Sequence, residues 1–134
     1  MFDAKHGVWL VSSIPLESNL VMPTVFISRS SDGKTWSDPV SIPPPVANQV
    51  DLDKNWTVCD DNSGSTHYGN CYTEFDNFGQ GDVEYMSTST DGGQTWSVPV
   101  PTAGNDKGLG GQPLVQPDGS GQRRRSLHPR ARRG

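Results

Sequence analysis

The stretch Ser89-Thr90-Asp91-Gly92-Gly93-Gln94-Thr95-Trp96 decides the fold. Its pattern, Ser-x-Asp-x-Gly-x-Thr-Trp, predicts a tight hairpin turn. The Asp91 carboxylate can accept hydrogen bonds from backbone amides in the turn, and the glycines tolerate the positive φ that such turns need. Thr95 and Trp96 then return the chain to the sheet, where we expect the indole to bury a large surface.

A second copy of the pattern lies upstream, at Ser30-Ser31-Asp32-Gly33-Lys34-Thr35-Trp36. It is one residue shorter between the aspartate and the tryptophan. Aligned from Trp36, it has Ser31 where the aspartate belongs and Asp32 one place later. Each copy continues into a similar segment, 37–40 or 97–100, and the two tryptophans are 60 residues apart. A unit that recurs in this way is typical of a repeat architecture.

The repeated pattern resembles the Asp-box, or bacterial neuraminidase (BNR) repeat, of sialidase-type β-propellers. The resemblance covers about residues 3–119. It implies an all-β fold built of four-stranded antiparallel blades, with a box between the third and fourth strands of each blade. In that family the box residues are structural, and here they are Ser30, Asp32, Gly33, Thr35, Trp36, Ser89, Asp91, Gly93, Thr95 and Trp96.

The chain has room for about two blades. Residues favoured in strands predict β-structure at 7–13, 20–30, 36–42, 53–59, 68–75, 82–89, 96–100 and 111–115. By the resemblance, these segments are the last three strands of one blade, one complete blade, and the innermost strand of a third. Because propellers have roughly four to eight blades, we expect a partial propeller, a fragment of a longer protein.

Charge divides the chain at its C-terminal end. Residues 1–122 carry 5 Lys or Arg and 15 Asp or Glu, whereas residues 123–134 carry 6 Arg and no acid. The acidic body speaks against nucleic-acid binding, and no apolar run approaches membrane-spanning length. After residue 119 no β-alternation continues, so we expect a propeller fragment at 1–119 and a disordered basic tail at 120–134. Translation of a shifted reading frame is a further hypothesis for this tail.

The two cysteines, Cys59 and Cys71, lie on strands that we expect to be neighbours. A disulfide between them would stabilise the fold by roughly 3 kcal/mol and would indicate an oxidising compartment. Two buried free thiols are the alternative. No Cys/His set has metal-ligand spacing, so we expect no metal and no cofactor.

The start of the predicted innermost strand of the complete blade carries polar groups and an aromatic residue: Asp51, Asp53, Lys54 and Trp56. In a propeller, one end of this strand faces the central channel. These residues are therefore candidate substrate-binding groups, and Asp53 is a candidate catalytic acid or base. The alternative is that Asp53 pairs with Lys54 or with backbone and that Trp56 lies in the core.

Tyr72 and Glu74 share one face of a predicted strand, because side chains alternate with period two. Sialidases use a tyrosine nucleophile with a carboxylate partner, so the pair is a second catalytic candidate. No family motif matches the two residues, and ordinary sheet residues are the alternative.

The resemblance implies an exported glycoside hydrolase of exo-α-sialidase type, which acts on terminal sialic acids of glycans and whose signal peptide is not in this sequence. Sialidases hold the substrate carboxylate with three arginines, but residues 1–122 contain only Arg29, and the family's Arg-Ile-Pro motif is absent. We therefore expect this chain to be inactive alone. The alternative is a non-catalytic BNR propeller that binds glycans or proteins. The expected partners are a glycan and the remaining blades.

Overall fold

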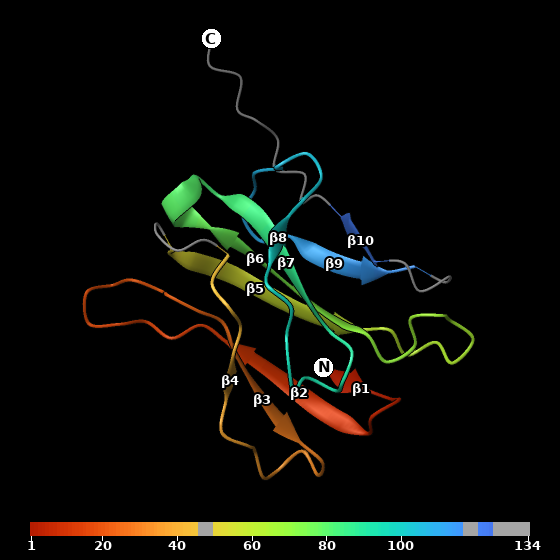
Figure 1. Cartoon of the computed structure of the whole chain (residues 1–134). Coiled ribbons are helices and arrows are strands. Elements are labelled where there is room, and N and C mark those ends of the chain that lie inside the picture. The colour runs from red at the N-terminus through yellow and green to blue at the C-terminus, as the bar shows by residue number, and fades with distance from the viewer. Residues whose placement is uncertain (46–49, 117–120, 125–134) are drawn as a thin grey trace.

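A computed structural model describes residues 1–45, 50–116 and 121–124, the last four by their backbone only. The regular structure of these residues is ten strands and one short 3-10 helix (Figure 1). The strands form two four-stranded antiparallel sheets and one two-stranded sheet. The predicted all-β class is therefore confirmed. Among the described residues, no helix is long and apolar enough to span a membrane.

The first sheet has the order β1 (Phe2–Asp3), β2 (Val8–Ser13), β3 (Phe26–Ser30) and β4 (Val40–Ser41). The prediction of three strands here missed β1, which pairs with β2 over two residues. The strand predicted at 20–30 is also too long, because Leu20 adopts a left-handed turn conformation with φ 64° and Pro23 has no amide to donate.

The second sheet has the order β5 (Leu52–Cys59), β6 (Cys71–Asn77), β7 (Val83–Ser89) and β8 (Val100–Pro101). The 3-10 helix η1 (Phe78–Gln80) connects β6 to β7. This sheet has the four antiparallel strands predicted between residues 53 and 100, although β8 starts at Val100 rather than at residue 96. Each box lies in the hairpin between the third and fourth strands of its sheet, as predicted.

The first box forms its turn around Asp32. One oxygen of this carboxylate, Oδ1, accepts hydrogen bonds from the amides of Lys34 and Thr35, both at 2.8 Å, and from the Ser30 hydroxyl at 3.0 Å. The Thr35 and Lys34 amides and the Ser30 hydroxyl lower the pKa of Asp32 to about 2. Asp32, and not Ser31, therefore fills the place of the motif's aspartate, and the missing residue is one of the turn glycines.

The second box forms an equivalent turn around Asp91. Its Oδ1 accepts hydrogen bonds from the amides of Gln94 and Thr95, and its Oδ2 accepts one from the Thr95 hydroxyl at 2.6 Å. Burial opposes ionisation, but hydrogen bonds from Thr95, Ser89 and Gln94 outweigh it and lower the pKa of Asp91. The two boxes differ in their tryptophans, because Trp96 is 8% exposed and Trp36 is 40% exposed. The expectation of a buried indole is therefore wrong for Trp36, which no sheet among the described residues covers.

One apolar core joins the two large sheets. Its members from the first sheet and its flanks are Val8, Leu10, Val25, Ile27 and Ile42, and those from the second are Leu52, Cys59, Cys71, Phe75, Tyr85 and Trp96. The predicted disulfide between Cys59 and Cys71 is present, with the two residues directly opposite on β5 and β6 and their Cα atoms 4.0 Å apart. It is compatible with an oxidising compartment.

The third sheet consists of β9 (Gln112–Val115) and β10 (Gly121–Arg124), which pair antiparallel. The predicted strand at 111–115 is confirmed. The expectation that no strand follows residue 119 is wrong for Gly121–Arg124, since backbone hydrogen bonding to the exposed edge of β9 does not require apolar alternation. The rest of the predicted tail, residue 120 and residues 125–134, lies outside the described residues.

Candidate functional site

The candidate site lies at the end of the second sheet opposite the box, where β5 begins and β6 ends. Asp53 on β5 stands directly across from Asp76 on β6. The pairing of β5 with β6 is then irregular until Trp56, and Lys54 within this bulge has φ 53°. A bulge re-aims side chains at a strand end and is common beside functional sites.

Asp53 and Lys54 form an ion pair at the rim of this site. The Lys54 Nζ lies 3.3 Å from Asp53 Oδ2, and the Lys54 amide donates to Asp53 Oδ1 at 2.8 Å. Both side chains are partly exposed. Pairing of Asp53 with Lys54 was the alternative prediction for Asp53. The ion pair nevertheless leaves both side chains accessible to a ligand.

Asp76 is the buried carboxyl group behind this pair. Its Oδ1 accepts a long hydrogen bond of 3.4 Å from the Gly110 amide, and its Oδ2 has no hydrogen-bond partner. Burial raises the pKa of Asp76 to about 6, with added repulsion from Asp53 and Asp82, against the opposing effects of the Gly110 amide and Lys54. Asp76 therefore keeps its proton to a higher pH than an exposed aspartate does.

Asp76 was not among the site residues predicted from the sequence, because the predicted strand ended at residue 75. The strand β6 instead runs to Asn77. One signal was available, since Asp76 continues the period-two face of Tyr72 and Glu74.

The Tyr72 and Glu74 pair lies further along the same face of β6. Glu74 is fully buried under the segment that leads into β9, so close to Gly111 that a Cβ there would clash with its carboxylate. Tyr72 is half-buried and stands across from Val58. A carboxylate buried under backbone does not reach a ligand, so this geometry gives Glu74 no access to a substrate.

The other two candidates occupy different surroundings. Asp51 supports the connections at this end, since its carboxylate accepts the Met22 amide at 3.0 Å and its carbonyl accepts the Phe78 amide. Trp56 is 51% exposed, so it does not lie in the core. It stands directly across from Glu74.

Arg29 is bound far from Asp53 and Asp76. Its Nε donates to the Gly92 carbonyl in the second box at 2.6 Å. The box follows the opposite end of the second sheet, so the arginine ties the first sheet to this box.

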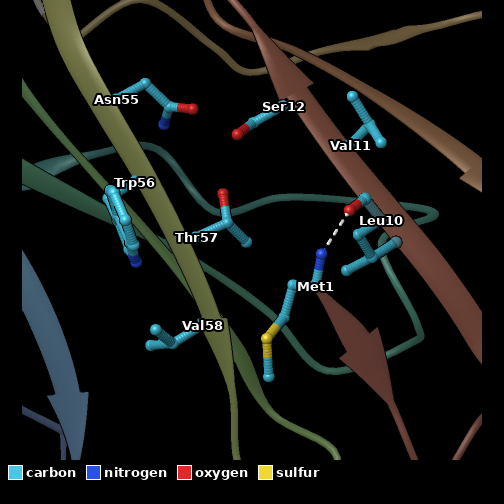
Figure 2. Close-up of a pocket in the computed structure, with 8 residues that line it drawn as sticks. All are labelled: Met1, Leu10, Val11, Ser12, Asn55, Trp56, Thr57 and Val58. Carbon is cyan, nitrogen blue, oxygen red and sulfur yellow. Dashed lines mark hydrogen bonds between the residues drawn. The ribbon is translucent and has the colours of Figure 1, made fainter.

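An open groove of about 370 Å³ runs between β2 and β5 (Figure 2). Its polar lining comes from the side chains of Ser12, Asn55 and Thr57 and from the Met1 ammonium group, which donates to the Leu10 carbonyl at 2.8 Å. The Trp56 side chain lies on the other side of β5 from Asn55 and Thr57 (Figure 2). The Asn55 amide is anchored by hydrogen bonds to the Thr73 hydroxyl and to the Glu74 carbonyl. Anchored amide and hydroxyl groups on this wall of the groove suit a polar ligand.

Comparison with known proteins supports the fold. Neither a family model nor a curated protein matches the chain. Among solved structures, the chain is similar to a crystal structure of a protein of unknown function from Dyadobacter fermentans DSM 18053, with a TM-score of 0.60 and 21% sequence identity over 88% of this chain. The chain spans 30% of the length of that protein. This likeness shows that the arrangement of sheets described here also occurs as one part of a longer polypeptide.

Proposed function

We propose that the chain is a two-blade segment of a larger Asp-box propeller, from an exported sialidase-like glycoside hydrolase that acts on terminal sialic acids. One observation carries the proposal. Two Ser-x-Asp hairpins occupy the same position, between the third and fourth strands of two four-stranded antiparallel sheets that share one core. The disulfide between Cys59 and Cys71 supports export.

In this proposal the Asp53 end of the second sheet faces the glycan. Asp53 and Lys54 are accessible there, so they are the groups that contact the ligand. Asp76 lies behind them and is a positioning residue, because its protonation near neutral pH changes the charge that Asp53 and Lys54 experience. Most glycoside hydrolases use two catalytic carboxyl groups that lie in different environments.

The chain alone is not expected to complete this chemistry. Glycoside hydrolysis passes through an oxocarbenium-like transition state, and a sialoside also brings a carboxylate that several cations must hold. Arg29, the one arginine of residues 1–122, is bound to the box at the other end of the sheet. The arginines that hold the substrate must therefore come from other blades.

The test compares this chain with the parent polypeptide, using a fluorogenic sialoside. The parent should hydrolyse it, the chain alone should not, and Asp53→Asn in the parent should lower kcat. A parent that folds but shows no turnover would exclude the hydrolase. Turnover by the chain alone, abolished by Asp53→Ala, would instead show that the chain carries a complete active site.

A second candidate is a propeller that binds glycans without hydrolysing them, and the groove between β2 and β5 favours it. Its lining offers the anchored Asn55 amide and neighbouring hydroxyl groups, which can recognise the hydroxyl groups of a glycan. Binding of a neutral oligosaccharide to the chain should then weaken in Asn55→Ala and Thr57→Ala and stay unchanged in Asp53→Asn. The opposite pattern would assign the ligand to the Asp53 end.

A further inference from the structure

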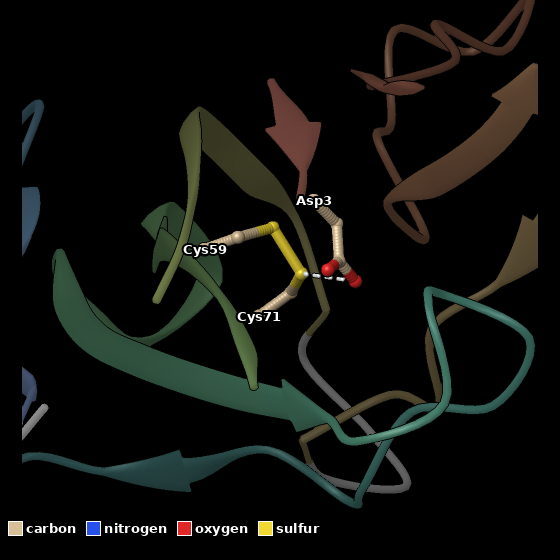
Figure 3. Close-up of side chains that lie close together, drawn as sticks. All are labelled: Asp3, Cys59 and Cys71. Atoms are coloured by element: carbon tan, nitrogen blue, oxygen red, sulfur yellow. Dashed lines mark hydrogen bonds between the residues drawn. A yellow bond between two sulfur atoms is a disulfide. The ribbon is translucent and has the colours of Figure 1, made fainter. Parts of the chain in front are cut away.

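Three potential metal ligands from different strands converge at the box end of the second sheet. They are Asp3 from β1, Cys59 from the end of β5 and Cys71 from the start of β6 (Figure 3). One ligand atom from each lies within 4.8 Å of the others, and all three residues are buried. Within the part of the chain that the structure describes, this is the one such group of His, Cys, Asp or Glu side chains. Sequence spacing did not reveal it, because Asp3 belongs to the first sheet and the cysteines to the second.

One carboxylate oxygen of Asp3 faces the disulfide, which cannot donate a hydrogen bond to it. Its Oδ2 lies 3.5 Å from the Cys71 sulfur, but a disulfide sulfur carries no hydrogen to donate. The same Oδ2 lies 2.7 Å from Nδ1 of His6, and Oδ1 accepts the His6 amide at 3.2 Å. His6 therefore pairs this buried carboxylate, while the disulfide beside Oδ2 gives that oxygen no hydrogen to accept.

We propose that reduction of the Cys59–Cys71 disulfide converts this cluster into a Zn²⁺ site, with Asp3 and the two thiolates as ligands. A phosphine reductant and one water convert the disulfide to two thiols and the phosphine oxide. Each thiol then loses its proton to solvent as its sulfur binds the metal. Two thiolates and one carboxylate are a donor set that suits zinc.

The geometry requires only small movements. Zinc–sulfur bonds of about 2.3 Å and zinc–oxygen bonds of about 2.0–2.2 Å place neighbouring ligand atoms roughly 3.5–3.8 Å apart. The three atoms are already within 4.8 Å of one another. Breaking the sulfur–sulfur bond frees the two sulfurs to separate, while the strands stay paired at Cys59 and Cys71.

His6 acts as an outer partner of this site. Its existing contact with Asp3 is the kind that orients a metal-binding carboxylate. Because Oδ2 of Asp3 already faces Cys71, zinc can bind this oxygen without displacing His6. Water then supplies the fourth zinc ligand. Bound zinc would tie the first sheet to the second through Asp3, so it would stabilise the reduced chain where the disulfide is absent. The zinc-bound chain and the disulfide-bonded chain exclude each other, because both use the same two sulfurs. The first belongs to a reducing environment and the second to an oxidising one.

The experiment titrates the chain with Co²⁺ and then with Zn²⁺, with and without prior phosphine reduction. The reduced chain should bind one Co²⁺ and show a thiolate-to-cobalt charge-transfer band, which Zn²⁺ abolishes. The oxidised chain should show no such band. Asp3→Asn should weaken binding at least about tenfold, and His6→Ala by about tenfold. Asp61→Asn is the matched control, because Asp61 also accepts an amide from the β1–β2 turn, that of Ala4, but is exposed.

Two results would overturn the proposal. One is a reduced chain that stays folded and shows no charge-transfer band. The other is an Asp3→Asn variant that binds Co²⁺ as tightly as the native chain, which would show that only the two cysteines bind the metal. If reduction unfolds the chain, zinc must restore its β-sheet circular dichroism, and failure to do so would also contradict the proposal.

Discussion

The two large sheets carry the same repeat, but equivalent positions are exposed in the first sheet and buried in the second. Trp9 on β2 stands across from the box residue Ser30, as Cys71 on β6 stands across from Ser89, so Trp9 and Cys71 occupy equivalent positions. Two residues later, Val11 is equivalent to Thr73. Trp9 is 44% and Val11 46% exposed, whereas Cys71 and Thr73 are fully buried. The first sheet covers this face of the second, and no described sheet covers the same face of the first.

The boxes repeat this contrast. Gly92 and Gly93 of the second box pack so closely against His6 and Leu10 that added Cβ atoms would lie 2.9 Å and 2.8 Å from their side chains. Gly33 of the first box has only the Trp9 ring nearby, at 3.7 Å. The local sequence therefore specifies the turn, and the neighbouring sheet determines whether the turn is buried.

The largest predicted difference concerns the two tryptophans. Trp96→Ala should lower the free energy of unfolding by about 3–5 kcal/mol, because Trp96 fills the shared core. Trp36→Ala should cost about 1 kcal/mol or less, as expected for an exposed side chain. Chemical denaturation of both variants measures the difference. Trp96→Phe is the control and should cost less, since the indole nitrogen has no hydrogen-bond partner to lose. Equal losses of unfolding free energy in the two alanine variants would contradict the burial of Trp96 and the exposure of Trp36.

The second prediction concerns buried charge. Asp76 belongs to the second sheet, and the equivalent position just past β2 is Ile14. Because the pKa of Asp76 is raised from 3.8 to about 6, the folded chain retains a proton that the unfolded chain releases. Stability should therefore fall as the pH rises from 4 to 6, and the full cost should persist above pH 6.

Asp76→Asn removes this penalty, so it should raise stability at pH 7 by roughly 2–3 kcal/mol and flatten the decline between pH 4 and 6. Denaturation midpoints measured across this range provide the check. A variant that is less stable at pH 7 and keeps the native slope would show that Asp76 is not the titrating group.

The smallest predicted difference concerns the glycines of the two boxes. Gly33 and Gly93 have φ values of 69° and 79°, so alanine should cost about 1–2 kcal/mol at either position from backbone strain. Gly93→Ala should cost about 1 kcal/mol more, because its Cβ meets Leu10. Thermal melts of the two variants, run side by side, measure this margin. A Gly33→Ala variant as unstable as Gly93→Ala would mean that the first box is also covered.

Much of the fold was predictable because it depends on local chemistry. The turn geometry of Asp32 and Asp91, the strands that flank them and the cross-strand disulfide all follow from residues near one another in sequence. The exposure of Trp36 was not predictable, because it depends on a neighbouring sheet and not on the box itself. β10 was missed because its pairing uses backbone groups alone.

The candidate site was predictable only in part. Asp53 and Lys54 were located from their place at a strand start, and the structure pairs them. The burial of Glu74 under Gly111 and the contact of Asp76 with Gly110 depend on the segment before β9, more than 30 residues away. A period-two pattern indicates which side chains share a face, but it does not indicate what covers that face.

Amide hydrogen exchange at Gly33 and Gly93 tests the central comparison most directly. Each amide donates the same local hydrogen bond to its box serine, at 2.8 Å to Ser30 and 2.9 Å to Ser89, so local chemistry is matched. If the first sheet covers the second box, the Gly93 amide should exchange much more slowly than the Gly33 amide and approach the global unfolding limit. Equal exchange rates for the two amides would contradict the account.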